Sequence, residues 1–126
     1  MLLFVYGTLM KGLHNHFLLK TSECLGSYKT VKKHMIYIDG TIPYLSDTFQ
    51  KYNIQGEVYN VSSETLKELD ELEGEGEWYI RKKIMVSDTN GDQIEVEAYY
   101  NYGKGIEFMS DNYHSFIMNY NDYTIL

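Results

Sequence analysis

The sequence predicts a mixed α+β domain: a small β-barrel or curved sheet of about six strands, flanked by short helices. Two observations lead to this fold class. Segments with the composition and alternation of strands recur along most of the chain, whereas only one segment has a clear helical pattern. The strands also do not alternate regularly with helices, which disfavours a parallel α/β sheet and favours an α+β architecture.

The expected strands are apolar or alternating runs bounded by turn residues. They cover six segments, residues 2–6, 26–33, 34–38, 54–59, 78–86 and 94–100. Residues 39–40 and 88–92 have the composition of tight turns. Pro43 has no N–H to give to a sheet, so we expect residues 41–45 to form an edge or a loop rather than a central strand.

One helix is expected from Ser62 to Glu73. Ser62 is a favoured N-cap, and Gly74 is a favoured stop. At about 100° per residue, one face of this helix carries an apolar stripe formed by Leu66, Leu69 and Leu72. Glu73 follows Leu66 by seven residues, so it returns to within about 20° of that leucine. Shorter helices are expected within residues 15–20 and 111–118.

Length and composition favour a single domain over residues 1–126. The chain is 44% apolar, with one proline, ten glycines and no low-complexity segment that would indicate a linker. The net charge of −7 disfavours nucleic acids and anionic membranes as partners, because both are bound largely through Lys and Arg. Cys24 is the single cysteine, which excludes an intrachain disulfide, and we expect it in the core. No segment resembles a signal peptide or membrane helix, so we expect a cytoplasmic protein. The sequence leaves the oligomeric state open, with a monomer favoured.

Glu73 is the candidate catalytic base. A carboxylate that a helix directs toward apolar side chains has its pKa raised, because loss of solvent disfavours the charged form. A glutamate in that environment can accept and return a proton near neutral pH. The alternative is that Glu73, at a helix end, bends to solvent and carries no chemistry.

The loop after the first strand is a candidate anion site. In Tyr6-Gly7-Thr8-Leu9, the glycine allows close approach of the backbone to a ligand, and successive N–H groups can form an anion-binding nest. An ordinary turn is the alternative. No His, Cys or Asp cluster has the spacing of a metal site, and no nucleotide-binding fingerprint is present, so we expect neither a metal nor a cofactor.

Six motifs together resemble the γ-glutamylcyclotransferase superfamily. In chain order they are Val5-Tyr6-Gly7-Thr8-Leu9, Ile42-Pro43-Tyr44, Gly56-Glu57-Val58-Tyr59, Leu69-Asp70-Glu71-Leu72-Glu73-Gly74, Tyr79-Ile80-Arg81 and Ala98-Tyr99-Tyr100. The resemblance covers residues 2 to about 102, and its most specific part is Y-G-T-L combined with L-D-x-x-E-G and Y-x-R. Thr8, where other branches typically carry serine, looks most like the γ-glutamylamine cyclotransferase branch. One departure from the family pattern is the Glu75-Gly76-Glu77 insert between the glutamate and the aromatic pair.

The resemblance implies a fold, an activity and a set of site residues. The fold would be the small cyclotransferase barrel with flanking helices. The activity would be cyclisation of a γ-glutamyl amide, such as a γ-glutamylamine, to 5-oxoproline with release of the amine and without a cofactor. Glu73 would act as general acid and base, and the substrate would contact Tyr6, Gly7, Thr8, Leu9, Pro43 and Tyr79. A non-catalytic binder of a small ligand or protein partner, and a structural module whose residues 70–77 are a solvated surface, are the alternatives.

Overall fold

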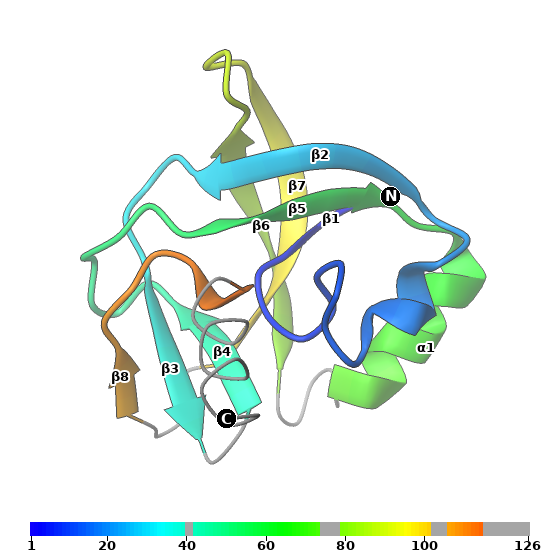
Figure 1. Ribbon diagram of the computed structural model, residues 1–126, viewed down its shortest axis with the longest axis horizontal. Coiled ribbons are helices and arrows are strands. Elements are labelled where there is room, and N and C mark those ends of the chain that lie inside the picture. The colour runs from blue at the N-terminus through cyan, green and yellow to red at the C-terminus, as the bar shows by residue number, and fades with distance from the viewer. Residues whose placement is uncertain (40–41, 74–78, 102–105, 115–126) are drawn as a thin grey trace, which may run out of the picture.

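The computed structural model describes residues 1–39, 42–73, 79–101 and 106–114 (Figure 1). Its elements, in chain order, are β1 (Leu2–Val5), the 3₁₀ helix η1 (His16–Leu19), β2 (Glu23–Thr30), β3 (Met35–Asp39), β4 (Ile42–Ser46), β5 (Gln55–Asn60), α1 (Ser63–Glu73), β6 (Ile80–Ser87), β7 (Gln93–Tyr100) and β8 (Ile106–Phe108). Within these residues, no helix is long and apolar enough to cross a membrane.

Five strands close into a barrel. Their order is β1-β5-β2-β6-β7, and β7 returns to β1 through a parallel pairing of Leu3 with Glu97. The other barrel pairings are antiparallel. From β7 the sheet continues through β4, β3 and β8, which lie together at the lower left of Figure 1. The predicted α+β class with a small barrel is therefore confirmed.

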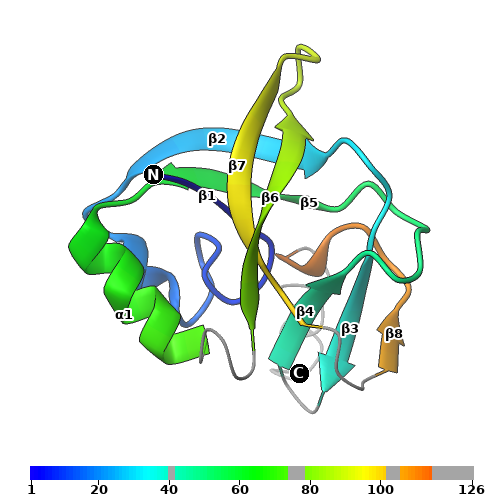
Figure 2. The same ribbon diagram turned by 180° about the vertical axis from the view of Figure 1, so that it is seen from behind.

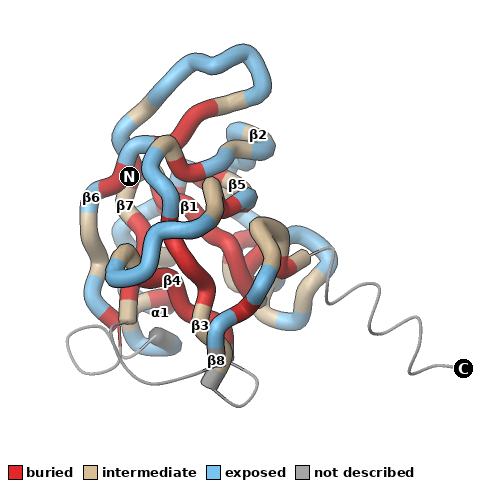
Figure 3. Tube along the Cα trace, turned by 90° about the vertical axis from the view of Figure 1, so that its left-hand side faces the viewer, coloured by how far each residue is buried: buried red, intermediate tan, exposed pale blue. Residues whose placement is uncertain are grey.

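The core lies inside the barrel and beneath α1. Buried residues concentrate along the inner strands, whereas β2 and the β6–β7 turn are largely exposed (Figure 3). Leu3, Phe4 and Val5 are all buried, so β1 has no solvent-facing side. Gly56 lets β5 approach β1 closely, because a Cβ there would lie 2.7 Å from the Phe4 ring and would also meet the carbonyl oxygen of Val5.

Two expectations about the sheet are wrong. Residues 42–46 form strand β4 between β7 and β3, rather than an edge or a loop. Pro43 is tolerated there because pairing with β7 is confined to Leu45, so the missing N–H interrupts no ladder on that side. Cys24 is exposed rather than in the core, because β2 is irregular between Cys24 and Gly26 and its first residues lie at the surface.

The helix α1 begins as predicted and lies beside η1 at one end of the barrel (Figure 2). The Oγ of Ser62 accepts the N–H of the third helical residue at 3.1 Å, which makes Ser62 the N-cap. Leu69 is fully buried and Leu66 is partly buried, but Leu72 is 47% exposed, so the predicted apolar stripe is wrong at its last leucine. The buried face of α1 is turned away from Leu72 and toward Asp70, which is partly buried.

Several expected features fall wholly or partly outside the described residues. The short helix expected within residues 15–20 is η1. The helix expected within 111–118 has only its first residues in the described part, where residues 113–114 are helical. The turn at 39–40 and the acidic residues 75–77 cannot be followed, since residues 40–41 and 74–78 lie outside it.

Candidate active site

The loop that follows β1, residues 6–12, is here called the Gly7 loop. The carbonyl groups of Gly7, Thr8 and Leu9 each accept a hydrogen bond of 3.0 Å from donors further along the chain, one of which is the ring Nδ1–H of His16. Among the residues that the structure describes, no acceptor bonds to the amide N–H groups of Gly7, Thr8 or Leu9. Gly7 and Leu9 are buried, and a buried N–H group without an acceptor costs free energy. The loop therefore presents three successive donors suited to an anion.

Side chains from three other segments brace the Gly7 loop. The Nδ2 of Asn15 donates to the Oγ1 of Thr8 at 2.9 Å. At the far end of the loop, the N–H of Lys11 donates to the carboxylate of Glu57 at 2.8 Å. The Nε2–H of His114 donates to the carbonyl of Lys11 at 2.7 Å. These bonds tie the loop to three other parts of the chain.

Pro43 and Tyr79 form a wall beside this loop. A Cβ placed on Gly7 would lie only 2.9 Å from the Cγ of Pro43, so the loop and β4 are packed directly against each other. The hydroxyl of Tyr79 donates to the carbonyl oxygen of Pro43 at 2.8 Å. The hydroxyl of Tyr6 donates to a carbonyl oxygen of β7 at 2.7 Å and accepts the N–H of Leu45 at 2.9 Å. The structure thus brings Tyr6, Gly7, Pro43 and Tyr79 together.

Glu73 is the last residue of α1, and its side chain lies outside the described part of the structure. Its place can be followed only through the helix backbone. At about 100° per residue, position 73 lies about 40° from Leu69 around the helix, within the face bounded by Leu69 and Asp70. The contact between the Glu73 carboxylate and the Gly7 loop stays a prediction.

A network of charged and hydroxyl groups joins α1 to β6 and β7. Arg81 makes a forked contact with Asp70, with Nε 2.9 Å from Oδ1 and Nη2 3.3 Å from Oδ2. Its Nη1 also lies 3.0 Å from the carboxylate of Glu97. The hydroxyl of Tyr99 donates to Asp70 Oδ1 at 2.6 Å. Partial burial acts to lower the pKa of Arg81, but its hydrogen bonds to Asp70 and the charges of Asp70 and Glu97 raise that pKa overall.

The sequence signal for this network was present but incomplete. Asp70 belongs to the L-D-x-x-E-G motif and Arg81 to the Y-x-R motif, but neither is among the site residues that the resemblance implies. The helical pattern places Asp70 at the border of the buried face. Nothing in that pattern identifies Arg81 and Tyr99 as its partners.

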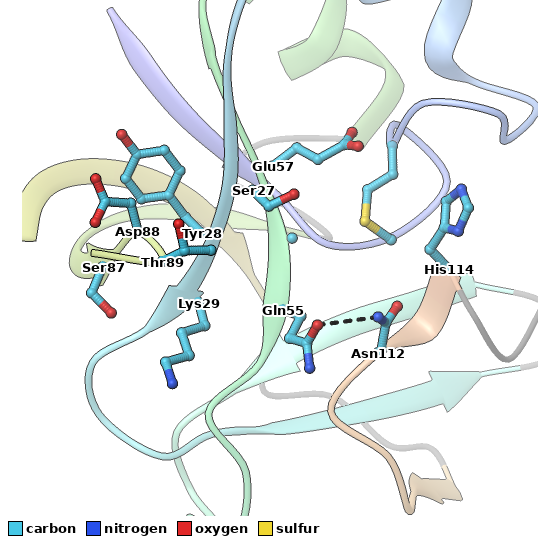
Figure 4. A pocket seen from close by; sticks show the side chains of 12 residues that line it. Ser27, Tyr28, Lys29, Gln55, Glu57, Ser87, Asp88, Thr89, Asn112 and His114 are labelled. Carbon is cyan, nitrogen blue, oxygen red and sulfur yellow. Dashed lines mark hydrogen bonds between the residues drawn. The ribbon is translucent and has the colours of Figure 1, made fainter. Parts of the chain in front are cut away.

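A separate groove of about 520 Å³ reaches the far end of the Gly7 loop (Figure 4). It is lined mainly by polar side chains of β2 and β5, by the start of the β6–β7 turn, and by Asn112 and His114. In this groove, the Nδ2 of Asn112 donates a hydrogen bond to the Oε1 of Gln55 at 3.2 Å. Glu57 and His114, which hold Lys11, are also part of its lining, but Pro43 and Tyr79 are not. The groove is therefore distinct from the wall of the candidate site.

Comparison with known proteins identifies the family to which the chain belongs. Residues 3–122 match the model of the family described as "Gamma-glutamyl cyclotransferase, AIG2-like". The chain belongs to this family. A Methanocaldococcus jannaschii relative, whose name places it provisionally among the gamma-glutamylcyclotransferases, is 42% identical over 98 residues, covering 77% of this chain and 81% of that protein.

Two further family relatives have more specific names. Gamma-glutamylaminecyclotransferase B of Danio rerio is 35% identical over 112 residues, which cover 82% of this chain and 59% of that protein. Gamma-L-glutamyl-butirosin B gamma-glutamyl cyclotransferase of Niallia circulans is 32% identical over 105 residues, covering 79% of this chain and 66% of that protein.

Two solved structures share the fold of this chain. A crystal structure of an AIG2-like protein from Mus musculus superposes with a TM-score of 0.73 at 27% identity, covering 82% of this chain and 78% of that chain. The crystal structure of YkqA from Bacillus subtilis gives a TM-score of 0.79 at 26% identity, covering 96% of this chain and 42% of that chain.

Proposed function

We propose that this protein cyclises γ-glutamyl amides to 5-oxoproline and releases the free amine, with γ-glutamylamines as its preferred substrates. The observation that carries the proposal is the Gly7 loop. Its three successive amide groups have no acceptor among the described residues, and the loop packs against a wall formed by Pro43 and Tyr79. Such a set of donors suits the α-carboxylate of a glutamyl group.

The reaction needs no nucleophile from the protein. The substrate's own α-amino nitrogen attacks its γ-carbonyl carbon, which forms the C–N bond of a five-membered ring. Glu73 accepts a proton from the attacking nitrogen and delivers it to the leaving nitrogen as the original amide bond breaks. Holding the chain folded supplies much of the rate, because well-oriented intramolecular reactions reach effective molarities of about 10⁵ M or more. Proton transfer by Glu73 adds about 10²–10⁴-fold.

The phase of α1 supports this role for Glu73. The buried face of the helix runs from Leu69 toward Asp70 and leaves Leu72 outside, and position 73 falls within that face by helical register. The choice of γ-glutamylamines rests on Thr8 in the Y-G-T-L motif and on similarity to the Danio rerio protein named for that activity.

The test is a substrate panel of γ-glutamylamines, γ-glutamyl dipeptides and glutathione, with equimolar 5-oxoproline and amine as products. We expect Glu73→Gln to lower kcat by about 10²-fold or more. Glu71→Gln is the matched control, because Glu71 lies on the exposed face of the same helical turn. Full activity in Glu73→Gln would show that Glu73 is not the general acid and base. Thermal stabilisation by a panel member without any turnover would instead support a non-catalytic binder.

A further inference from the structure

The network between α1 and the barrel connects the helix that carries Glu73 to the wall of the candidate site. We propose that Asp70, held by Arg81 and Tyr99, is a positioning residue that fixes the last turn of α1, and therefore Glu73, relative to the Gly7 loop. The inference rests on the proposed function, since it gives Asp70 a role through Glu73.

The end of α1 needs an anchor. The last turn of a helix has carbonyl groups without intrahelical partners, and helix ends fray easily. Leu72 provides little hold there because it is 47% exposed. The last turn also lacks a basic side chain that would interact favourably with the helix dipole. Asp70 lies three residues before Glu73, close to one helical turn, so fixing Asp70 limits the movement of Glu73.

The contact of Asp70 with Arg81 is built to fix an orientation. A forked contact of a guanidinium with both oxygens of a carboxylate defines the angle between the two groups as well as their distance. The side chains of Arg81 and Asp70 are only 21% and 27% exposed, so water competes less for their hydrogen bonds than it would at an open surface. Arg81 is itself held from the barrel side by Glu97 on β7.

Tyr99 extends the network to the substrate side. Its hydroxyl donates a hydrogen bond to Asp70, and its backbone carbonyl accepts one from the hydroxyl of Tyr6. Tyr6 is the first residue of the Gly7 loop. The ring of Tyr99 packs edge-on against the ring of Tyr79, with centroids 6.2 Å apart and planes at 87°. The hydroxyl of Tyr79 in turn holds the carbonyl of Pro43. A continuous series of contacts therefore runs from Asp70 to both sides of the proposed substrate site.

The two carboxylates on Arg81 provide a matched pair of variants. Asp70→Asn removes the negative charge through which Arg81 holds α1. Glu97→Gln removes the other negative charge paired with Arg81, which lies on β7, and leaves the contact between Arg81 and α1 in place. A role limited to stabilising the fold predicts that the two variants lose activity in proportion to their loss of folded protein. A positioning role predicts that Asp70→Asn loses far more turnover than Glu97→Gln when both are compared at equal folded fraction.

The experiment measures kcat and KM separately with a γ-glutamylamine. We expect Asp70→Asn to lower kcat by about 10–10²-fold with KM changed less than about threefold, because displacement of a catalytic group by about 1 Å costs up to 10²-fold in rate. Glu97→Gln should keep at least about a third of kcat. Tyr99→Phe, which retains the ring and both ion pairs, should lower kcat by about three- to tenfold. Equal kcat losses in Asp70→Asn and Glu97→Gln would overturn the proposal.

Hydrogen exchange separates this proposal from the proposed function. In Asp70→Asn, the amides of residues 70–73 should exchange faster than in the parent protein, while those of β6 and β7 keep their protection. In Glu97→Gln, residues 70–73 should exchange as in the parent. If the parent turns over no γ-glutamyl amide, the proposed function is wrong, and these exchange rates still decide whether Asp70 fixes the end of α1. Unchanged exchange at 70–73 in Asp70→Asn would refute the positioning role.

Discussion

Replacing Gly7 by alanine tests whether the substrate loop depends on its close packing against β4. The added Cβ would lie 2.9 Å from the Cγ of Pro43 and 3.8 Å from its Cβ. Ordinary carbon–carbon contacts lie at about 3.5–4.0 Å, so the loop and β4 must separate by about 0.6–1.1 Å. Pro43 has little freedom to relieve this contact, because only its ring pucker can shift Cγ and its carbonyl is held by Tyr79.

This separation should affect both stability and turnover. Overpacking a well-filled site by one methyl group costs about 1–3 kcal/mol of unfolding free energy. A displacement of about 1 Å in the loop that orients the substrate costs up to 10²-fold in rate. We therefore expect Gly7→Ala to lower kcat/KM by about 10–10²-fold. The effect is steric, since Gly7 is not among the glycines with positive φ.

Gly91→Ala is the control that separates stability from catalysis. Gly91 has a φ of +86° and open space around its Cα, so alanine there strains the backbone by about 1–2 kcal/mol without meeting another atom. It lies in the β6–β7 turn, which projects from the barrel away from the Gly7 loop (Figures 1 and 2). Urea unfolding and 5-oxoproline release are measured for both variants. If Gly7→Ala loses no more kcat/KM than Gly91→Ala at equal folded fraction, the reasoning about the loop is wrong.

Three further predictions concern the fold around the site. Tyr6→Phe leaves a carbonyl of β7 and an N–H of β4 without their buried partner, so we expect a loss of about 1–3 kcal/mol in urea unfolding. Ser62→Ala removes the N-cap of α1 and should cost about 1 kcal/mol in the same assay, with kcat unchanged at equal folded fraction. Burial lowers the pKa of His34 below 6.5, and its neutral ring accepts the hydroxyl of Tyr100 at 2.7 Å. The unfolding free energy should therefore be intact above pH 6.5 and fall as the pH drops below it, because the unfolded chain binds the proton at a higher pH than the folded protein does. The measurement compares urea unfolding of the parent and of His34→Gln at pH 7.5 and 5.5. A parent protein that loses no more stability than His34→Gln over this range would contradict the prediction.

Local patterns predict much of this fold. The N-cap at Ser62 and the hairpin turn at 88–92 form as expected, because short-range hydrogen bonds determine both. The errors arise where the partner lies far along the chain. The strand around Pro43 depends on pairing with β3 and, at one position, with β7. The exposure of Leu72 depends on where the barrel wall meets α1, which helical periodicity does not specify.

In the candidate site, too, the sequence predicts the local features better than the contacts between distant residues. The motifs predict the Gly7 loop, Pro43 and Tyr79 as parts of one site, and the structure places Pro43 in contact with both Gly7 and Tyr79. The path of the loop is set locally, because its carbonyl groups bond to donors within the next eight residues, and its amides have no acceptor among the described residues. The link between Asp70 and Tyr99 spans 29 residues and needs the barrel to close before the two side chains meet. A periodicity argument places Asp70 on a face but cannot supply that partner.

The Asp70–Arg81 contact also bears on the Glu75-Gly76-Glu77 insert, which the resemblance implies between these two motifs. Asp70 and Arg81 lie 11 residues apart and on opposite sides of this segment, and their forked contact joins its two ends. The entropic cost of closing a loop grows slowly with its length once the ends are fixed. Extra residues between these anchors can therefore be accommodated without moving the end of α1 or the start of β6.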